Sequence, residues 1–430
     1  MSAKPIYTDK ELDWALVPNS EKNIWHPYAT VPSAIPEFLA ESTEGVYITL
    51  KGGLKVIDAM SSWWAAALGH RHPEIIAAAK TQIDQMPHVM FGGLSHEPAE
   101  KLAEKILKML GPGFNHVFYA DSGSISVEVA LKMALQAQLG RGHTQRRKIL
   151  TWRGGYHGDT LGAMSVCDPE GGMHKIWKNY VPQQVFIPAP EAEPNIEAYI
   201  SEIEAITPWD EIAALILEPT IQGAGGMRMH PPALVKAVSE TAKKHGVIII
   251  YDEIATGFWR TGSLFAFHEV GFTPDIICLG KAITSGFMTF AATITTTDIA
   301  KDVGTLMHGP TFMANPLACS VALASLSLFD DPSWAQKIQK IEAQLRRELQ
   351  PAALNPLVAD VRVRGAIGVI ELKEPLSTPD FEKVTRTALK YGVWIRPFGK
   401  LIYTMPPYIS TEAEITQICQ ALNAAVEELS

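Results

Sequence analysis

Two short apolar runs that end in charged residues constrain the fold of this chain most. Residues 247–251, VIIIY, lead into Asp252 and Glu253, and the run that ends at residue 279 leads through a glycine into Lys281. Short continuous apolar runs are typical of strands buried on both faces of a mostly parallel sheet. Because α/β proteins bind ligands at the carboxyl ends of such strands, these charged side chains are candidates for one site.

An acid and a lysine at neighbouring strand ends fit two interpretations. A pyridoxal phosphate enzyme uses a lysine for the Schiff base and a carboxylate for the pyridinium nitrogen. The alternative is a structural ion pair. These two segments alone leave both interpretations open.

Residues 116–138, HVFYADSGSISVEVALKMALQAQ, predict a strand followed by a helix that begins near Ser122. Free backbone N–H groups at a helix N-terminus bind phosphate, and Gly123 and Ser124 would allow close approach and hydroxyl donation. No GKS or GKT follows, so this is not a Walker loop. An ordinary serine N-cap is the alternative reading.

Further strands and helices alternate along the middle of the chain. Residues 148–160 predict a strand and a glycine-flanked turn that presents Tyr156, which either stacks on a planar ligand or packs in the interior. Residues 165–210 look loop-rich, and a later strand ends at Glu218. Residues 289–300 form a β-rich run. The strand–helix–strand order predicts an α/β fold with a parallel sheet.

The composition changes near residue 330, and the rest of the chain predicts an α+β pattern. A hairpin is expected at 46–60, around Gly52 and Gly53. We therefore expect a segment 1–59 that joins a small domain, a large domain at 60–330 and a C-terminal small domain at 331–430. Residues 1–23 are expected to be poorly ordered apart from a short helix.

Composition excludes several classes of protein. The 430 residues are 47% hydrophobic and 19% charged with a net charge of −9, which argues against a nucleic-acid-binding surface. The N-terminus contains acids and lacks an apolar core, and no run approaches the length of a membrane helix, so we expect a soluble, cytoplasmic protein. The four cysteines have no zinc spacing, and we expect buried thiols and no metal site.

Joined in this order, the elements resemble the fold-type I pyridoxal phosphate enzymes, and within them the class III (omega) aminotransferases. The resemblance covers about residues 25–410. It implies a large domain with a mostly parallel sheet flanked by helices and a smaller α+β domain. The segments that carry it are DSGSISVEVALKMA, GGYHGDT, LILEPTIQGAGG, YDEIATGFWRTG and CLGKAITSG.

The resemblance implies roles for the cofactor residues. Lys281 would form the Schiff base with pyridoxal 5′-phosphate and act as the catalytic base, and Asp252 would pair with the pyridinium nitrogen. Gly123 and Ser124 would contact the phosphate at the helix start, and Tyr156 would stack on the cofactor ring. Pro310 and Thr311 would lie on a loop that reaches the phosphate of the neighbouring subunit in a homodimer.

For the substrate, the resemblance implies that Arg396 binds a carboxylate. Tyr28, Trp63 and Gly309, together with Tyr156 and Lys281, would line an aliphatic pocket, although packing is the alternative for Trp63 and Tyr28. Asp159 and Arg260 would contribute to recognition of the amino donor, directly or through neighbouring residues. Glu218 would pair with an arginine when no carboxylate is bound.

A narrower similarity, to the class III members of biotin biosynthesis, rests on WHPYAT, MSSWWAAALGHRHPE, HVMFGGLSH, MHGPTFMANPLAC and GVWIRPFGKLIYTMPPY. It implies amino transfer from S-adenosylmethionine to 8-amino-7-oxononanoate, giving 7,8-diaminononanoate by a ping-pong route through pyridoxamine phosphate. The alternatives are an omega-aminotransferase with another donor or acceptor, and a non-catalytic protein on this fold.

One position departs from the family pattern. The motif after the two acids usually reads TGFGRTG, and this chain has Trp259 in place of the second glycine. A large ring at a position that permits unusual φ values predicts an altered loop or a filled cavity near Arg260.

Overall fold

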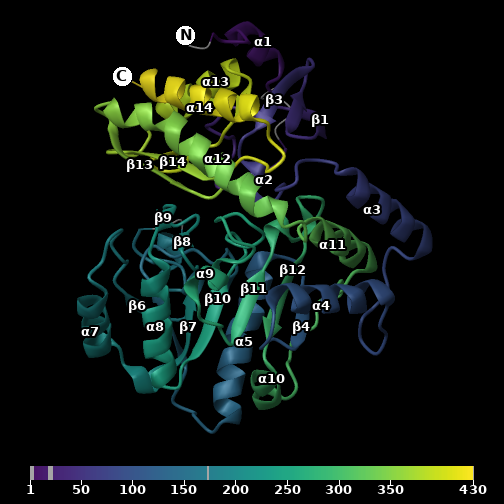
Figure 1. Ribbon diagram of the computed structural model, residues 1–430, viewed down its shortest axis with the longest axis vertical. Helices are drawn as coiled ribbons and strands as arrows, with labels where there is room; N and C mark the ends of the chain where they lie inside the picture. The colour runs from purple at the N-terminus through teal and green to yellow at the C-terminus, as the bar shows by residue number, and fades with distance from the viewer. Residues whose placement is uncertain (1–3, 18–22, 172–173, 430) are drawn as a thin grey trace. The chain divides into compact units, whose positions relative to one another are not determined.

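The computed structural model describes residues 4–17, 23–171 and 174–429 (Figure 1). The expectation of poor order at residues 1–23 lies partly outside these ranges. The short helix expected there is present as α1 (Asp9–Trp14), and it begins with a capping box between Thr8 and Glu11. Within the described ranges, no helix has both the length and the apolar character needed to cross a membrane.

The chain divides into two compact units. The small unit joins Met1–His72 with Pro332–Ser430, and the large unit is Pro73–Asp331. The predicted domains, with boundaries after residues 59 and 330, stay a prediction about which part of the chain binds the cofactor.

A seven-stranded sheet is the framework of the large unit. Its strands are β4 (His116–Ala120), β5 (Lys148–Trp152), β6 (Val185–Ile187), β7 (Ile212–Leu217), β10 (Ile248–Asp252), β11 (Ile276–Leu279) and β12 (Ala291–Thr295). Their order is β4-β12-β11-β10-β7-β5-β6. β12 is antiparallel to both of its neighbours, and the other pairings are parallel. The prediction of a mostly parallel sheet is confirmed.

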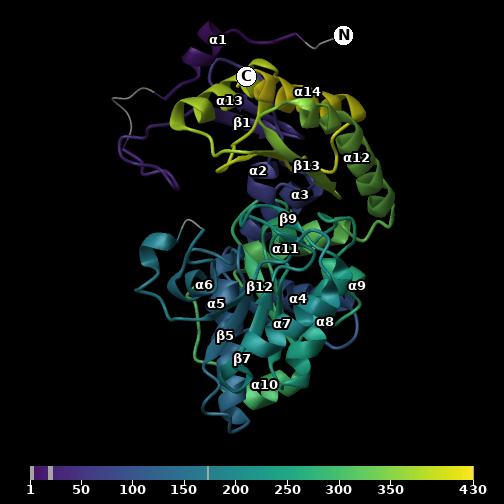
Figure 2. The ribbon, with the colours of Figure 1, turned by 90° about the vertical axis from the view of Figure 1, so that its left-hand side faces the viewer.

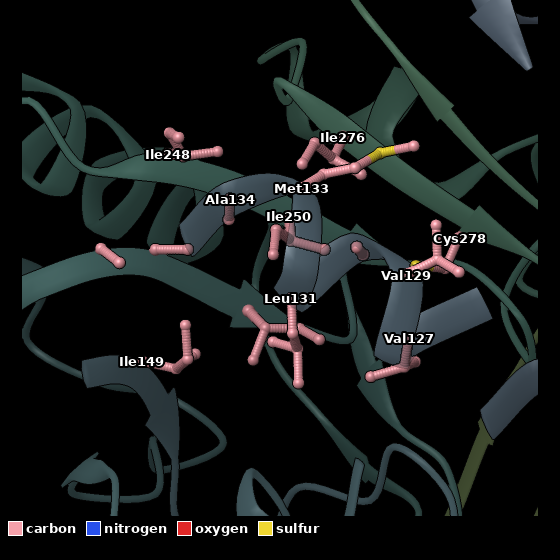
Figure 3. Packing of buried hydrophobic residues seen from close by; sticks show 14 of the residues in the cluster. Val127, Val129, Leu131, Met133, Ala134, Ile149, Ile248, Ile250, Ile276 and Cys278 are labelled. Carbon is pink, nitrogen blue, oxygen red and sulfur yellow. The ribbon is translucent and has the colours of Figure 1, made fainter. Parts of the chain in front are cut away.

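Helices pack on both faces of this sheet. Residues 248 and 250 of β10 belong to the apolar cluster that α5 (Gly123–Gly140) buries with Val127, Leu131 and Met133 (Figure 3). Because side chains alternate along a strand, Tyr251 points to the opposite face. There its hydroxyl lies 2.7 Å from the Ser239 hydroxyl of α8 (Pro232–Lys244). The two helices therefore fix the central strands from both sides.

The remaining elements of the large unit surround the sheet. Helix α7 lies beside α8 in both ribbon views (Figures 1 and 2). Residues 165–210 thus hold a helix that the loop-rich prediction missed, and the β-rich run at 289–300 is one strand followed by α10. The helices are α3 (Pro73–Gln85), α4 (Glu97–Leu110), α6 (Leu161–Ser165), α7 (Ile196–Ile206), α9 (Ala266–Val270), α10 (Thr297–Val303) and α11 (Pro316–Leu328), and the short strands are β8 (Ile221–Gln222) and β9 (Arg228–Met229).

The small unit has the predicted α+β character. The expected hairpin is present as β2 and β3, which pair antiparallel. Its sheets have the orders β1-β2-β3-β15 and β13-β14-β16. The strands are β1 (Ala40–Glu44), β2 (Tyr47–Leu50), β3 (Leu54–Asp58), β13 (Val358–Arg364), β14 (Ile367–Leu372), β15 (Val393–Trp394) and β16 (Leu401–Thr404), and the helices are α2 (Ser61–Trp64), α12 (Ser333–Leu349), α13 (Thr378–Lys390) and α14 (Glu412–Glu427).

Candidate active site

Three neighbouring strands of the large unit end in charged residues that the sequence singled out. β10 pairs in parallel with β11 on one side and with β7 on the other, so their carboxyl ends lie at the same edge of the sheet. Asp252 ends β10, Glu218 follows β7, and Lys281 follows β11 after one glycine. The sheet therefore brings the predicted acid and lysine to one edge.

Both oxygens of the buried Asp252 carboxylate accept hydrogen bonds. Oδ1 accepts from the backbone N–H of Ile254 at 3.0 Å, and Oδ2 accepts from ring Nδ1 of His157 at 2.8 Å. Burial lowers the pKa of His157, but the hydrogen bond and negative charge of Asp252 outweigh burial, so the pKa is raised. The two hydrogen bonds therefore keep the Asp252 carboxylate in one orientation.

Glu218 lies in the same buried region and holds the turn after β5. Its Oε2 accepts from the backbone N–H of Tyr156 at 3.1 Å, and its Oε1 accepts from the N–H of Gly223 at 2.8 Å. Burial raises the pKa of Glu218 to about 7, against the lowering effect of His157. Both carboxylate oxygens of Glu218 thus accept from backbone amides, and its pairing with an arginine stays a prediction.

Lys281 stands where β11 passes into a 3₁₀ turn, with a φ of +44°. Burial lowers the pKa of its amino group, although the negative charges of Asp252 and Glu218 oppose the shift. A lysine with a lowered pKa supplies more unprotonated amine at neutral pH, which is the form that acts as nucleophile or base.

The start of α5 and the turn at Tyr156–Asp159 lie against each other. Ser122 caps the helix through Ile125 N–H, which confirms that a helix begins there. The backbone N–H of Asp159 donates to Ser124 Oγ at 3.1 Å. Gly158 has a φ of +123°, and a Cβ there would clash with the Ser124 side chain. Glycine at 158 therefore allows the turn to reach the helix start.

Tyr156 and Asp159 are joined by a residue that the sequence analysis did not single out. The ring of His174 stacks on the Tyr156 ring, with centroids 5.8 Å apart and an interplanar angle of 22°. Its Nε2 lies 2.8 Å from Asp159 Oδ1. Arg260, the other residue predicted around donor recognition, is fully buried.

In the small unit, Trp63 and Arg396 lie near each other. The Arg396 guanidinium carbon is 5.9 Å from the Trp63 ring centroid and 5.7 Å from that of Phe381. Trp63 belongs to a left-handed turn, since Ser61 to Trp64 all have positive φ values. Trp63 is 42% exposed and Trp64 is buried, so the two tryptophans face different surroundings.

The other predicted substrate and subunit-contact residues are more open. Tyr28 is 55% exposed, with a φ of +56°. In the large unit, Gly309 and Thr311 are exposed and Pro310 is half-buried. Their loop is connected to α5 by His308, whose Nδ1 lies 3.1 Å from Lys132 Nζ.

Trp259, the departure from the family motif, occupies a left-handed position with a φ of +70°. Its indole N–H donates to the Phe329 carbonyl at 3.2 Å, and the buried neighbour Phe258 stacks on the Phe329 ring at 5.5 Å. The large ring is thus accommodated by the chain that follows α11. Its predicted effect on the donor site stays a prediction.

Glu253 fixes the other end of the same loop. Its Oε2 accepts from the Thr256 hydroxyl at 2.6 Å, and its Oε1 accepts from the backbone N–H of Phe267 at 2.7 Å. Burial raises the pKa of Glu253 to about 7, although these hydrogen bonds lower it.

The large unit fits a pyridoxal phosphate cofactor. The group requires an amine for its aldehyde, a carboxylate for its ring nitrogen and amide donors for its phosphate. Lys281, Asp252 and the start of α5 would supply these groups. Gly123 lets Ile254 pack closely against the helix start, because a Cβ there would lie 3.1 Å from Ile254 Cγ2. Among the described residues, no cluster of His, Cys, Asp and Glu is arranged to hold a metal ion.

Comparison with known proteins places the chain in a family. The sequence pattern of the aminotransferases of class III matches residues 28–426. The chain therefore belongs to the class III aminotransferases, a family of pyridoxal phosphate-dependent enzymes, and the resemblance seen in the sequence is confirmed.

Individual proteins show which members of the family this chain is similar to. The chain is 54% identical over 416 residues to the adenosylmethionine-8-amino-7-oxononanoate aminotransferase of Corynebacterium glutamicum, covering 94% of this chain and 97% of that protein. The crystal structure of the enzyme of that name from Methanocaldococcus jannaschii is similar with a TM-score of 0.88 at 35% identity, over 95% of this chain and 97% of the other. An amine transaminase from an uncultivated Pseudomonas species, in the PLP-bound internal aldimine form, has a TM-score of 0.88 at 30% identity, over 95% and 99%.

Proposed function

We infer that this chain is a pyridoxal phosphate-dependent aminotransferase that moves an amino group from S-adenosylmethionine to 8-amino-7-oxononanoate, giving 7,8-diaminononanoate in biotin biosynthesis. One observation carries the inference. Lys281 and the buried Asp252 meet at one sheet edge in a chain that is 54% identical to a relative named for this reaction.

When bound, pyridoxal phosphate withdraws electrons from the substrate carbon that loses its proton. We assign Lys281 to hold the cofactor aldehyde until the substrate amine displaces it. The Lys281 amine would also serve as the base that moves the proton between the substrate α-carbon and the cofactor C4′. Its lowered pKa supports this role, because a protonated amine accepts no proton.

We assign Asp252 to the ring nitrogen of the cofactor, where an ionised carboxylate favours a bound proton. His157 supports this role, because its hydrogen bond fixes Asp252 Oδ2 at 2.8 Å. The proton at the ring nitrogen is thus held by a carboxylate that is itself held by a buried imidazole.

We assign Gly123 and Ser124 to the phosphate. The position of Ser124 against the turn at residue 158 supports a bound group at the start of α5. Tyr156 would cover the cofactor ring and line the substrate pocket. Pro310 and Thr311 would contact the phosphate of a second copy of the chain, in a homodimer with shared active sites, and the exposure of Thr311 supports this assignment.

For the keto acid, Arg396 would bind the carboxylate through paired guanidinium hydrogen bonds. Trp63, whose ring lies 5.9 Å from that guanidinium, would line the aliphatic chain with Tyr28 and Gly309. Such a biosynthetic enzyme is expected in the cytoplasm.

The donor is tested by spectroscopy. The protein is loaded with pyridoxal phosphate and mixed separately with S-adenosylmethionine, L-lysine and 1-phenylethylamine, and the absorbance of the lysine-bound cofactor is followed. We expect S-adenosylmethionine to remove this absorbance and 8-amino-7-oxononanoate to restore it. Removal by one of the other two amines alone would identify an aminotransferase with another donor. Failure to form the lysine-bound cofactor would indicate a non-catalytic protein.

A further inference from the structure

We propose that His174 is a positioning residue for the amino-donor half of the reaction, because it joins the Tyr156 ring and the Asp159 carboxylate. The proposal rests on the proposed function, since it concerns one of the two substrates that share the site. Tyr156 and Asp159 were each predicted as site residues from the sequence, and His174 would be a third residue of the same site.

The contacts of His174 have two distinct parts. Its ring lies against Tyr156 at 5.8 Å between centroids, and its Nε2 donates to Asp159 Oδ1 at 2.8 Å. The His174 side chain is 8% exposed and that of Asp159 is 52% exposed. The imidazole is therefore buried, and the carboxylate to which it donates is accessible to solvent.

The backbone around both partners is fixed at other points. Tyr156 N–H is held by Glu218, and Asp159 N–H is held by Ser124 Oγ at 3.1 Å. The side-chain torsions of Tyr156 and Asp159 depend on the groups that pack against them. His174 contacts both side chains at once, so it orients the ring and the carboxylate relative to each other.

The chemistry of the substrates suggests which half-reaction depends on this arrangement. S-adenosylmethionine carries a positively charged sulfonium two methylene groups away from its reacting carbon, and an oriented carboxylate attracts this charge. The acceptor carries its positive charge, an ammonium, on the carbon directly beside its reacting ketone, so the two charges stand at different distances from the cofactor. We therefore expect the Asp159–His174 contact to strengthen donor binding with little effect on the acceptor.

Two substitutions separate the contacts. His174→Phe keeps a ring against Tyr156 and removes the hydrogen bond to Asp159, whereas His174→Gln keeps an N–H donor and removes the ring. The matched control is His245→Phe. His245 also stacks on an aromatic ring, Trp209 at 4.3 Å, and also bonds a carboxylate, Glu204 at 2.8 Å, on another part of the large unit.

Each half-reaction is followed by stopped-flow absorbance over a range of substrate concentrations. We expect His174→Phe to raise the apparent Kd for the donor about tenfold or more, the usual effect of losing a hydrogen bond to a charged group. The acceptor Kd and the affinity of the cofactor-free protein for pyridoxal phosphate should stay near wild type. His174→Gln should restore most of the donor affinity, and His245→Phe should change neither half-reaction.

A double-mutant cycle with Asp159→Asn decides whether the two residues act together. We expect the donor defects of His174→Phe and Asp159→Asn not to add. Equal loss in both half-reactions, additive defects, or a change only in the thermal unfolding midpoint would overturn the proposal. If wild type reacts with a cationic donor other than S-adenosylmethionine, the proposed donor is wrong and the same cycle with that donor still judges His174. If no donor reacts, the proposed function and the proposed role of His174 are both overturned.

Discussion

The edge of the large sheet and the loop at residues 308–311 differ in burial. The charged side chains at the sheet edge are enclosed by this chain, whereas the loop is partly exposed. At the sheet edge, Asp252 and His157 are almost inaccessible, and each Asp252 oxygen has a hydrogen-bond partner. In the loop, Gly309 and Thr311 face solvent. The sheet edge is predicted to hold the cofactor of its own chain, whereas Pro310 and Thr311 of the loop are predicted to contact the cofactor phosphate of a second copy. We propose that one copy of the chain supplies the chemistry and that a second copy completes the phosphate site.

The largest expected effect comes from removing the reactive amine. Lys281→Ala should lower turnover by a factor on the order of 10⁴ or more, because no other described lysine stands at this sheet edge to replace the base. Steady-state rates and the absorbance of the lysine-bound cofactor measure the loss. Lys243→Ala, on the exposed surface of α8, is the control. Substantial remaining activity in Lys281→Ala would break the claim that the buried edge holds the chemistry.

Removing the charge of Asp252 tests the buried pair. Asp252→Asn leaves the His157 imidazole without its anionic partner, so we expect the free energy of unfolding to fall by about 3 kcal/mol and the pKa of His157 to fall. Denaturant unfolding and NMR titration measure the two changes. Glu204→Gln, which disrupts the more exposed Glu204–His245 pair, should cost little. Equal losses in both variants would show that burial of the Asp252 pair has no special effect.

The exposed loop is tested by mixing two defective variants. Thr311→Ala should weaken cofactor binding roughly 10- to 100-fold, through loss of a hydrogen bond to phosphate. When it is unfolded and refolded with Lys281→Ala, half of the dimers should contain one intact site, so activity should recover to roughly a quarter of wild type. A mixture no more active than the average of the two variants would show that the loop serves its own chain.

The smallest effect, expressed per pH unit, concerns the pH dependence of stability. Glu253 has a folded pKa of about 7 against an ordinary value of 4.5, so between these values the folded protein holds a proton that the unfolded chain has lost. The free energy of unfolding should therefore rise as pH falls from 7 to 4.5, by at most about 1.4 kcal/mol per pH unit for this proton. Glu253→Gln should flatten this slope in denaturant unfolding curves. Glu412→Gln, on the exposed first turn of α14, should not change it.

The strands and the sheet edge that carries the candidate site were predictable from the sequence. Short apolar runs predict the strands, and the charged residues directly after these runs indicate the edge. The role of His157 was not, because β7 lies between its strand and that of Asp252. Its contact depends on the path of a turn that contains two glycines with positive φ, Gly154 and Gly158. A one-dimensional pattern carries no information about that path.

Other omissions had a signal in the sequence. Helix α7 begins directly after Asn195, which caps it, and buries Tyr199 and Ile203 four residues apart. That spacing is helical, but neighbouring prolines favoured a loop. His174 gave no such signal, since it lies outside any regular element and reaches its partners only through the tertiary fold.

The most direct test of the proposed function separates the two half-reactions in time. The loaded protein is treated with S-adenosylmethionine labelled with ¹⁵N at its amino group, freed of unbound donor by gel filtration, and then given 8-amino-7-oxononanoate. We predict that each site delivers one labelled amino group, recovered by mass spectrometry in 7,8-diaminononanoate. Product formed only when donor and acceptor are present together, or product without the label, would contradict the account.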